Sequence, residues 1–428
     1  MYRVEKSVMQ NGEERILWID ILKGILIILV VIGHATGKFN GYIYQFHMAA
    51  FFMLSGYTEN YSKRKTGSYI AAKWFRLMQP VLVVFFVGIL ISSLLERLGV
   101  YSFLFEDAQI YLGVKESIRQ FLFYGNNYVW WMGACWFIIA LFFALIVQRI
   151  IHDITNDSIL ILLISGALVL VQSCFSRTSL KFSLLDGKVV LIAQFYLCLG
   201  ELARKTNCIR RINGCGWRRA LLLNSCFAAV LIYAAQALHY SVDWPSADFE
   251  FSLVGCLIGV CDTLLVAGIA YMLSKANGKH ISLLQIIGKN TMPIVFFHFV
   301  FFTVIHLVLA FFHVLSWQEV KTFLIPSSVA ELWWLYAFGS ICLSILFWQI
   351  MMKIRPLRIL LGQDTCFLCL TKTTKITEEM ENAAKKKDRC WQAIIIHRKQ
   401  LILRNRSIIP RYITVVVSST HTAENHDL

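Results

Sequence analysis

The sequence predicts an all-α, polytopic membrane helix bundle with about ten transmembrane helices. Apolar residues make up 57% of the 428 residues, and the mean hydropathy is +0.61. Apolar runs of roughly 18 to 22 residues recur along the chain, which is the length that matches a lipid hydrocarbon layer. Because no polar segment in the first 365 residues is long enough for a separate soluble domain, we expect one membrane domain.

The first apolar run, from Ile16 to Gly33, is too long for a signal-peptide core, so we expect it to remain as the first helix. The expected organisation is a cytoplasmic segment at 1–15, a membrane domain at 16–358 and a basic tail at 359–428. Charges, Gly or Pro limit each further apolar run. The predicted spans after the first are 44–58, 79–95, 132–150, 158–175, 188–203, 219–238, 252–274, 291–312 and 331–352.

Lys and Arg concentrate in alternate loops, which predicts that both termini lie in the cytoplasm. With the N-terminus inside, the inner loops include the basic clusters at 63–76 and 204–219. The loop at 239–250, expected outside, has no Lys or Arg. The formal charge of +15 therefore reflects membrane topology, and no nucleic-acid partner is expected.

Neither the cysteines nor the tail predicts an additional site. The twelve cysteines are mostly scattered singly in apolar segments, where a thiol packs as a small hydrophobe, and no metal site is expected. The only close pair, Cys366 and Cys369, lacks the second pair of a zinc site. The tail has a short apolar segment, Ala393 to Leu403, which leaves two alternatives: a basic element lying on anionic lipid, or a weakly ordered appendage.

Three ionisable residues, Asp20, Lys23 and His34, lie within or at the ends of the first span. Ionisable groups in an apolar helix are costly and usually face a cavity or a partner. At about 100° per residue the three share one stripe, and Asp20 lies roughly 21 Å from His34 along the axis. Asp20 is thus too far away to orient that histidine directly, and pairing with Lys23 or Arg15 near the inner surface is the expectation.

Two more histidines have similar placements. His47 opens the second span after a loop short enough to return it beside His34, and His298 lies among Phe residues in the ninth span. A neutral imidazole relays protons near neutral pH, so three such histidines indicate a polar site within the bundle. The alternatives are an interfacial position for His34 and a single interhelical hydrogen bond for His298.

Lys73 and Arg76 precede the third span, where two explanations are open and compatible. They serve as positive-inside anchors, or they bind a phosphate-rich cytoplasmic cofactor. Ser55 and Gly56 close the second span, where small residues favour close helix packing.

Motifs in order along residues 15–355 resemble the membrane-bound acyltransferase-3 family, and the opening is most similar to its fucose 4-O-acetylase-like branch. There are two departures: Lys23 stands where many relatives carry Arg, and Thr291 stands where they carry Ser. The motifs that carry the resemblance are Trp18 to Gly24, Val30 to His34, Phe46 to Met48, Phe51 to Tyr57, Arg76 to Pro80, Cys135 to Phe142 and Ile287 to His298.

The resemblance implies an O-acyltransferase of the bacterial inner membrane. It would move an acyl group, commonly acetyl from acetyl-CoA, to a hydroxyl of a cell-surface sugar, exopolysaccharide or lipid-linked glycan. It implies that His34 is the catalytic base and that His47 and His298 lie close to the acyl path. Residues matching the CoA-binding positions are Arg76, Lys73 and Lys23, and structural or oxyanion candidates are Asp20, Ser55, Asn290 and again Lys23.

The main alternative is a proton-coupled transporter or polysaccharide export protein built on the same intramembrane Asp, Lys and His. That function predicts an internal repeat and paired Gly or Pro breaks in the spans. The sequence offers only Pro293 near a helix start and no obvious repeat.

Overall fold

The computed structural model describes residues 8–10, 13–15, 17–61, 65–105, 113–124, 130–175, 187–214, 216–242, 244, 253–276 and 278–363. The chain divides into two compact units, Met1–Asp364 and Thr365–Leu428. The second unit lies outside the described residues, as do Cys366, Cys369 and nearly all of the predicted tail.

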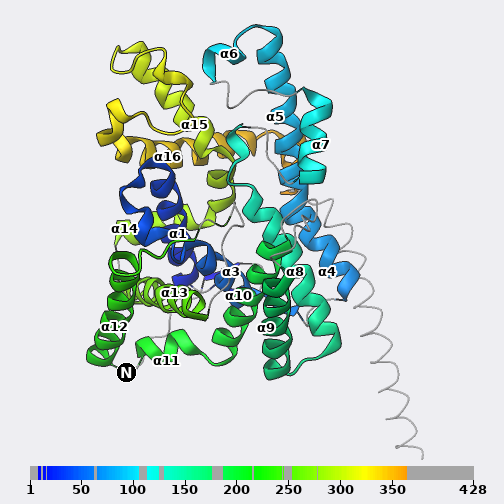
Figure 1. The fold of residues 1–428 in the computed structure, drawn as a ribbon, viewed down its shortest axis with the longest axis vertical. Coiled ribbons are helices and arrows are strands. Elements are labelled where there is room, and N and C mark those ends of the chain that lie inside the picture. Colours follow the sequence, from blue (N-terminus) through cyan, green and yellow to red (C-terminus); the bar gives the residue numbers. More distant parts are fainter. Residues whose placement is uncertain are drawn as a thin grey trace, which may run out of the picture. The chain divides into compact units, whose positions relative to one another are not determined.

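Within the described residues, one helix corresponds to each of the ten predicted spans (Figure 1). These helices confirm the all-α bundle, with boundaries that differ from the predictions by a few residues. They are α1 (Leu17–Ala35), α3 (His47–Thr58), α5 (Gln79–Arg97), α8 (Trp136–Ile154), α9 (Ser158–Phe175), α10 (Gly187–Lys205), α12 (Trp217–Gln236), α13 (Leu253–Leu273), α15 (Thr291–Phe311) and α16 (Trp333–Met351).

Shorter elements connect the long helices. The only strands in the described residues form an antiparallel hairpin, β1 (Val8–Gln10) and β2 (Glu13–Arg15), in the segment expected to be polar. The α-helical connectors are α2 (Asn40–Ile43), α4 (Thr66–Lys73), α6 (Tyr101–Leu104), α7 (Val114–Tyr124), α11 (Cys208–Gly214), α14 (Lys279–Lys289) and α17 (Arg355–Leu360). The 3₁₀ turns are η1 (Gly37–Phe39), η5 (Trp130–Met132), η6 (Glu319–Lys321) and η7 (Ser327–Leu332), and η3 (Trp74–Met78) is π-helical.

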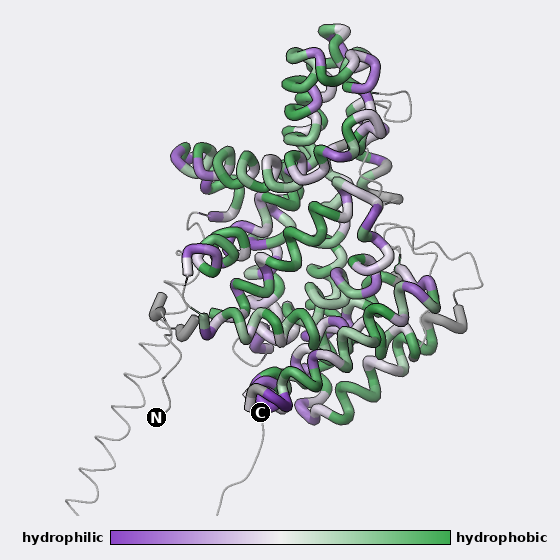
Figure 2. Tube along the Cα trace, turned by 90° about the vertical axis from the view of Figure 1, so that its left-hand side faces the viewer, coloured by the Kyte–Doolittle hydropathy of each residue, from purple (hydrophilic) through white to green (hydrophobic). Residues whose placement is uncertain are grey.

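Seven helical stretches of the described chain are long and apolar enough to cross a membrane. Figure 2 shows apolar residues along most of their length and polar residues mainly near the ends. Helices satisfy all backbone hydrogen bonds within one segment, which a bilayer interior requires. The seven stretches are Leu17–Ala35, Thr66–Arg97, Trp136–Ile154, Arg218–Gln236, Val254–Leu273, Thr291–Phe311 and Ser327–Met351.

Helix α3 is too short to cross by itself. Its 12 residues rise about 18 Å, against roughly 30 Å for a hydrocarbon layer. Helix α3 is accordingly not one of the seven stretches, and His47 at its first position is 8% exposed. The count of ten crossings and the cytoplasmic location of both termini stay predictions.

Glycines allow α3 and α10 to pack backbone to backbone. A Cβ atom at Gly56 would lie 2.0 Å from the Leu197 carbonyl oxygen, and one at Gly200 would lie 1.8 Å from that of Met53. Both distances are too short for a real contact, so any larger residue would push the helices apart. The packing role predicted for Ser55 and Gly56 agrees with this geometry, and the Ser55 hydroxyl donates within its own helix to the Phe51 carbonyl, at 2.8 Å.

Candidate active site

Helix α1 presents one face to a cavity inside the bundle. Ile27, Val30 and His34 lie three and four residues apart, a spacing that places side chains on one face of a helix, and all three line the cavity. The cavity has a volume of about 130 Å³. His34 is thus not a lipid-facing residue at the end of α1; its side chain is directed into the protein.

Helix α3 and Tyr44, which precedes it at the end of α2, form the facing wall. Tyr44, His47, Met48 and Phe51 line the cavity, and the ring centroids of Tyr44 and His47 are 5.1 Å apart. The Nδ1 atom of His47 lies 2.9 Å from the carbonyl oxygen of Ile43, so Nδ1 carries the hydrogen and donates it. The other ring nitrogen, Nε2, is then an acceptor in the neutral imidazole, which is the form needed to take a proton from a substrate.

Aromatic and small apolar side chains complete the cavity. Phe137, at the start of α8, packs its ring against Phe51 with centroids 5.4 Å apart. Trp244 also lines the cavity and is 3% exposed. Its ring packs against Phe52, with centroids 5.4 Å apart. The remaining lining residues are Ala134, Trp136, Val242 and Val295.

His298 of α15 packs against the His34 ring without lining the cavity. Their rings are stacked, with centroids 5.5 Å apart and planes 26° apart, and Phe299 packs against both. His298 is fully buried and is not one of the residues that line the cavity. Its Nδ1 atom donates to the Ile294 carbonyl at 2.7 Å, and its Nε2 atom has no hydrogen-bond partner among the described residues.

The three predicted histidines, from α1, α3 and α15, thus lie close together in the structure.

A family model described as an acyltransferase domain, that of the acyltransferase-3 family, matches residues 16–353. The chain belongs to the acyltransferase-3 family. Searches of curated proteins and of solved structures gave no match. Family membership and the long apolar helices together establish a multi-pass membrane acyltransferase.

Two motifs of the acyltransferase domain meet at the other end of α1. A Cβ atom at Gly24 would lie 2.2 Å from the Leu284 carbonyl oxygen of α14, and one at Gly288 would lie 1.8 Å from that of Asp20. Asp20 is buried there, at 4% exposure. Helix packing thus explains the glycines in these two motifs, because α1 and α14 each need a glycine where they cross.

This crossing lies far from His34 along α1. Lys23 is eleven residues before His34, or roughly 16 Å along the axis. Asn290 begins α15, and its side-chain amide donates to the Ile286 carbonyl at 2.8 Å. Neither Lys23 nor Asn290, nor Ser55, is among the cavity-lining residues. Their oxyanion role stays a prediction without support from the geometry.

Lys73 and Arg76 differ in their surroundings. The Lys73 ammonium is paired with the Glu59 carboxylate and lies 5.3 Å from the centroid of the Tyr69 ring. Arg76 is exposed, and it belongs to the π-helical segment η3, a distortion that is frequent at functional sites. Of the two side chains, that of Arg76 is the exposed one.

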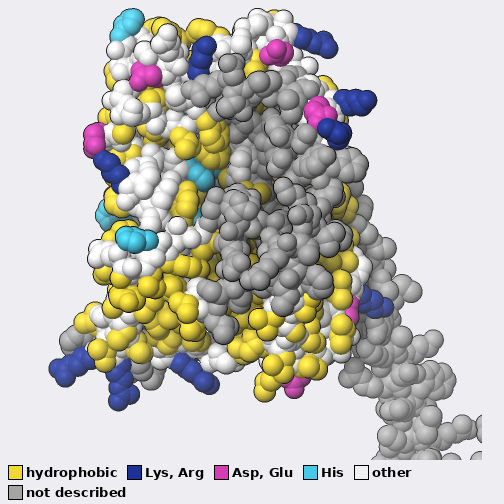
Figure 3. Space-filling model, viewed as in Figure 1, with side chains coloured by type: hydrophobic (Ala, Val, Ile, Leu, Met, Phe, Trp, Pro, Cys, Tyr) yellow, Lys and Arg dark blue, Asp and Glu magenta, His cyan; other side chains and the backbone are white. Residues whose placement is uncertain are grey.

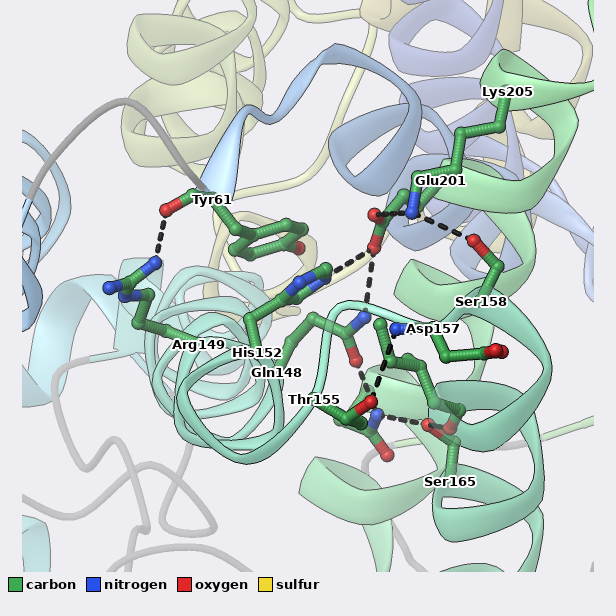
Figure 4. A network of polar contacts seen from close by, with 12 residues as sticks. Tyr61, Gln148, Arg149, His152, Thr155, Asp157, Ser158, Ser165, Glu201 and Lys205 are labelled. Atoms are coloured by element: carbon green, nitrogen blue, oxygen red, sulfur yellow. Dashed lines mark hydrogen bonds and ion pairs between the residues drawn. The ribbon is translucent and has the colours of Figure 1, made fainter.

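A second polar cluster joins α8, α9 and α10 (Figure 4). The Glu201 carboxylate accepts from His152 Nε2 at 2.8 Å, Gln148 Nε2 at 3.1 Å and Lys205 Nζ at 2.9 Å. The His152 ring also stacks on Tyr61, with centroids 4.6 Å apart. Sequence reasoning missed this cluster because its members come from three spans and no local spacing connects them.

Sequence reasoning also missed the aromatic lining residues Tyr44, Trp136 and Trp244. Aromatic residues are common at membrane interfaces and in helix cores, so they carry little signal without coordinates. On the face drawn in Figure 3, hydrophobic side chains are dense in the lower half of the view, and Lys and Arg lie below them and also in the upper part of the view. This pattern is typical of a chain whose charges flank an apolar layer.

Proposed function

We propose that the protein is an integral-membrane O-acyltransferase of the bacterial inner membrane. It transfers an acyl group from acyl-CoA to a hydroxyl of a cell-surface sugar, exopolysaccharide or lipid-linked glycan. The proposed acyl group is acetyl. The observation that supports this best is the cavity lined by His34 and His47 within an acyltransferase-3 domain. The likeness of the first span to the fucose 4-O-acetylase-like branch supports a sugar acceptor.

In the proposed reaction His34 acts as the general base. It takes the proton from the acceptor hydroxyl, and the oxygen attacks the thioester carbonyl carbon. The tetrahedral intermediate collapses as the carbon–sulfur bond breaks, and the proton passes from His34 to the departing thiolate. The products are an ester and free CoA, and the histidine returns to its neutral form.

His47 and His298 have different proposed roles. His47 lines the cavity with Nε2 as an acceptor, so it is placed to bind the acceptor hydroxyl or to share its proton. His298 is a positioning residue, because it contacts the His34 ring and is not part of the cavity lining. Neither role needs a charged histidine in the resting site, which suits a site inside an apolar bundle.

CoA is made in the cytoplasm, so the proposed donor site lies on the side where the sequence predicts the basic loops. Arg76 is the principal candidate to bind CoA phosphates, because a guanidinium makes paired hydrogen bonds to phosphate oxygens. Lys73 and Lys23 are secondary candidates. The pairing of Lys73 with Glu59 also gives it a structural role in holding α4.

The deciding experiment measures release of free CoA thiol from acetyl-CoA by the purified protein with an envelope glycan fraction. The variant His34→Ala should lower turnover by roughly 10²- to 10⁴-fold, the contribution of a general base. His280→Ala is the matched control, because His280 is exposed on α14. It should leave turnover unchanged.

The same assay tests the donor site. Arg76→Ala should raise the KM for acetyl-CoA by roughly tenfold with a smaller change in kcat, whereas Arg97→Ala, an exposed arginine at the other end of α5, should not. If the wild-type protein neither binds acetyl-CoA nor releases thiol with any glycan, the proposed donor and acceptor are wrong.

A further inference from the structure

The cavity has two ends of different chemical character. Along α1 the lining residues run from Ile27 through Val30 to His34, a rise of roughly 10 Å. On the facing wall they run the opposite way, from Tyr44, which precedes α3, and His47, which opens it, to Phe51. The two histidines and the Tyr44 ring therefore mark one end, and aliphatic and phenyl groups mark the other.

The apolar end is closed by rings from facing helices. Phe51 of α3 and Phe137 of α8 are in contact, with centroids 5.4 Å apart, and both line the cavity. Ile27, Val30 and Val295 supply aliphatic walls. No Lys, Arg, Asp or Glu is among the described residues that line the cavity.

We infer that this apolar end is the acyl subsite, that it selects short, uncharged acyl groups, and that Phe51 limits their length. This inference rests on the proposed function and adds the donor class. In this arrangement the acyl chain extends into the apolar end while its carbonyl carbon lies near His34. In the transfer step the carbon–sulfur bond breaks as the carbon–oxygen bond to the acceptor forms, and His34 carries the acceptor proton to the thiolate.

Charge and size set the selectivity by separate means. A succinyl group would place a carboxylate among apolar side chains without a cation or a set of hydrogen-bond donors, and burying an unpaired charge is very costly. A butyryl group extends two methylene groups further than an acetyl group toward the contacting Phe51 and Phe137 rings. One methylene group in a close-fitting apolar pocket changes specificity by roughly 10- to 200-fold.

The experiment compares kcat/KM for acetyl-, propionyl-, butyryl- and succinyl-CoA with one glycan fraction. The wild-type protein should use butyryl-CoA at least roughly tenfold less well than acetyl-CoA, and succinyl-CoA at least roughly a hundredfold less well. Phe51→Leu should raise the butyryl-to-acetyl ratio by roughly tenfold. It should leave the succinyl-to-acetyl ratio low, because leucine adds no cation.

Phe52→Leu is a closely matched control. Phe52 is the next residue of α3 and also packs on Phe137, with centroids 5.1 Å apart, but it does not line the cavity. Its butyryl-to-acetyl ratio should stay within about twofold of the wild-type ratio. If Phe51→Leu fails to fold, Val295→Ala widens the same end from α15 and should raise the ratio in the same direction.

Three outcomes would overturn the inference. Succinyl-CoA used as well as acetyl-CoA would show that the subsite accepts charge. Equal ratios for the Phe51 and Phe52 variants would show that Phe51 does not contact the acyl group. Absence of transfer from all four donors would reject the proposed function itself, and the acyl subsite with it; success with acetyl-CoA but without the expected ratios would reject the subsite alone.

Discussion

Two histidine clusters among the described residues differ in their hydrogen-bond partners: one is bonded to a carboxylate, and the other faces a cavity. His152 is bonded to Glu201, which also accepts from Gln148 and Lys205, and its ring is covered by Tyr61. At the cavity, by contrast, His34 and His47 are lining residues, and His47 and His298 each donate from Nδ1 to the backbone carbonyl of the residue four positions earlier.

This difference in hydrogen bonding distinguishes a cluster that stabilises the fold from one that is available for catalysis. A buried polar group that has all its partners stabilises one arrangement of helices, because breaking any contact leaves another group unpaired. A buried histidine with an acceptor nitrogen directed at a cavity adds nothing comparable to stability, and its nitrogen is available to a substrate proton. The His152 cluster is therefore expected to hold the fold, and the His34 cluster to perform the reaction.

Within this comparison, the largest effect is expected when the same histidine-to-glutamine substitution is made in both clusters. His47→Gln should reduce acyl transfer by roughly a hundredfold, because glutamine keeps a polar side chain but cannot accept a proton. His152→Gln should leave transfer per folded molecule within about threefold. Turnover of each variant is measured beside its thermal unfolding in detergent. A larger loss of turnover from His152→Gln than from His47→Gln would reverse the assignment of the two clusters.

The next effect concerns stability. Glu201→Ala removes the acceptor for three donors, which should lower the free energy of unfolding by about 3 kcal/mol and the midpoint of thermal unfolding accordingly. The control is Glu96→Ala on α5, where the carboxylate is exposed and little change is expected. Equal midpoints for the two variants would contradict a structural role for the Glu201 cluster.

The two clusters also differ in how well the sequence predicts them. His34, His47 and His298 are conspicuous because an ionisable residue in a long apolar run is rare. The turn-counting argument correctly separated Asp20 from His34, since a helix has a fixed rise per residue. The Glu201 cluster gave no such signal, because His152 and Lys205 lie near helix ends, where charged residues are ordinary.

The elements of the fold also differ in how well the sequence predicts them. Long apolar runs predicted the ten helices because membrane thickness imposes a length that few other structures need. The sequence did not predict α4, α7 or α14, which are shorter helices with fewer apolar residues. It also gave no indication that Lys73 pairs with Glu59, because that contact depends on how the chain turns between α3 and α4.

The smallest expected effect tests the histidine end of the cavity. Tyr44→Phe keeps the ring that packs against His47 and removes only the hydroxyl. If this end receives the acceptor sugar, loss of one neutral hydrogen bond should raise the acceptor KM by roughly three- to tenfold. The KM for acetyl-CoA should not change, because the donor occupies the Phe51 end. A rise confined to the acetyl-CoA KM would place the donor beside Tyr44 and exchange the two ends of the cavity.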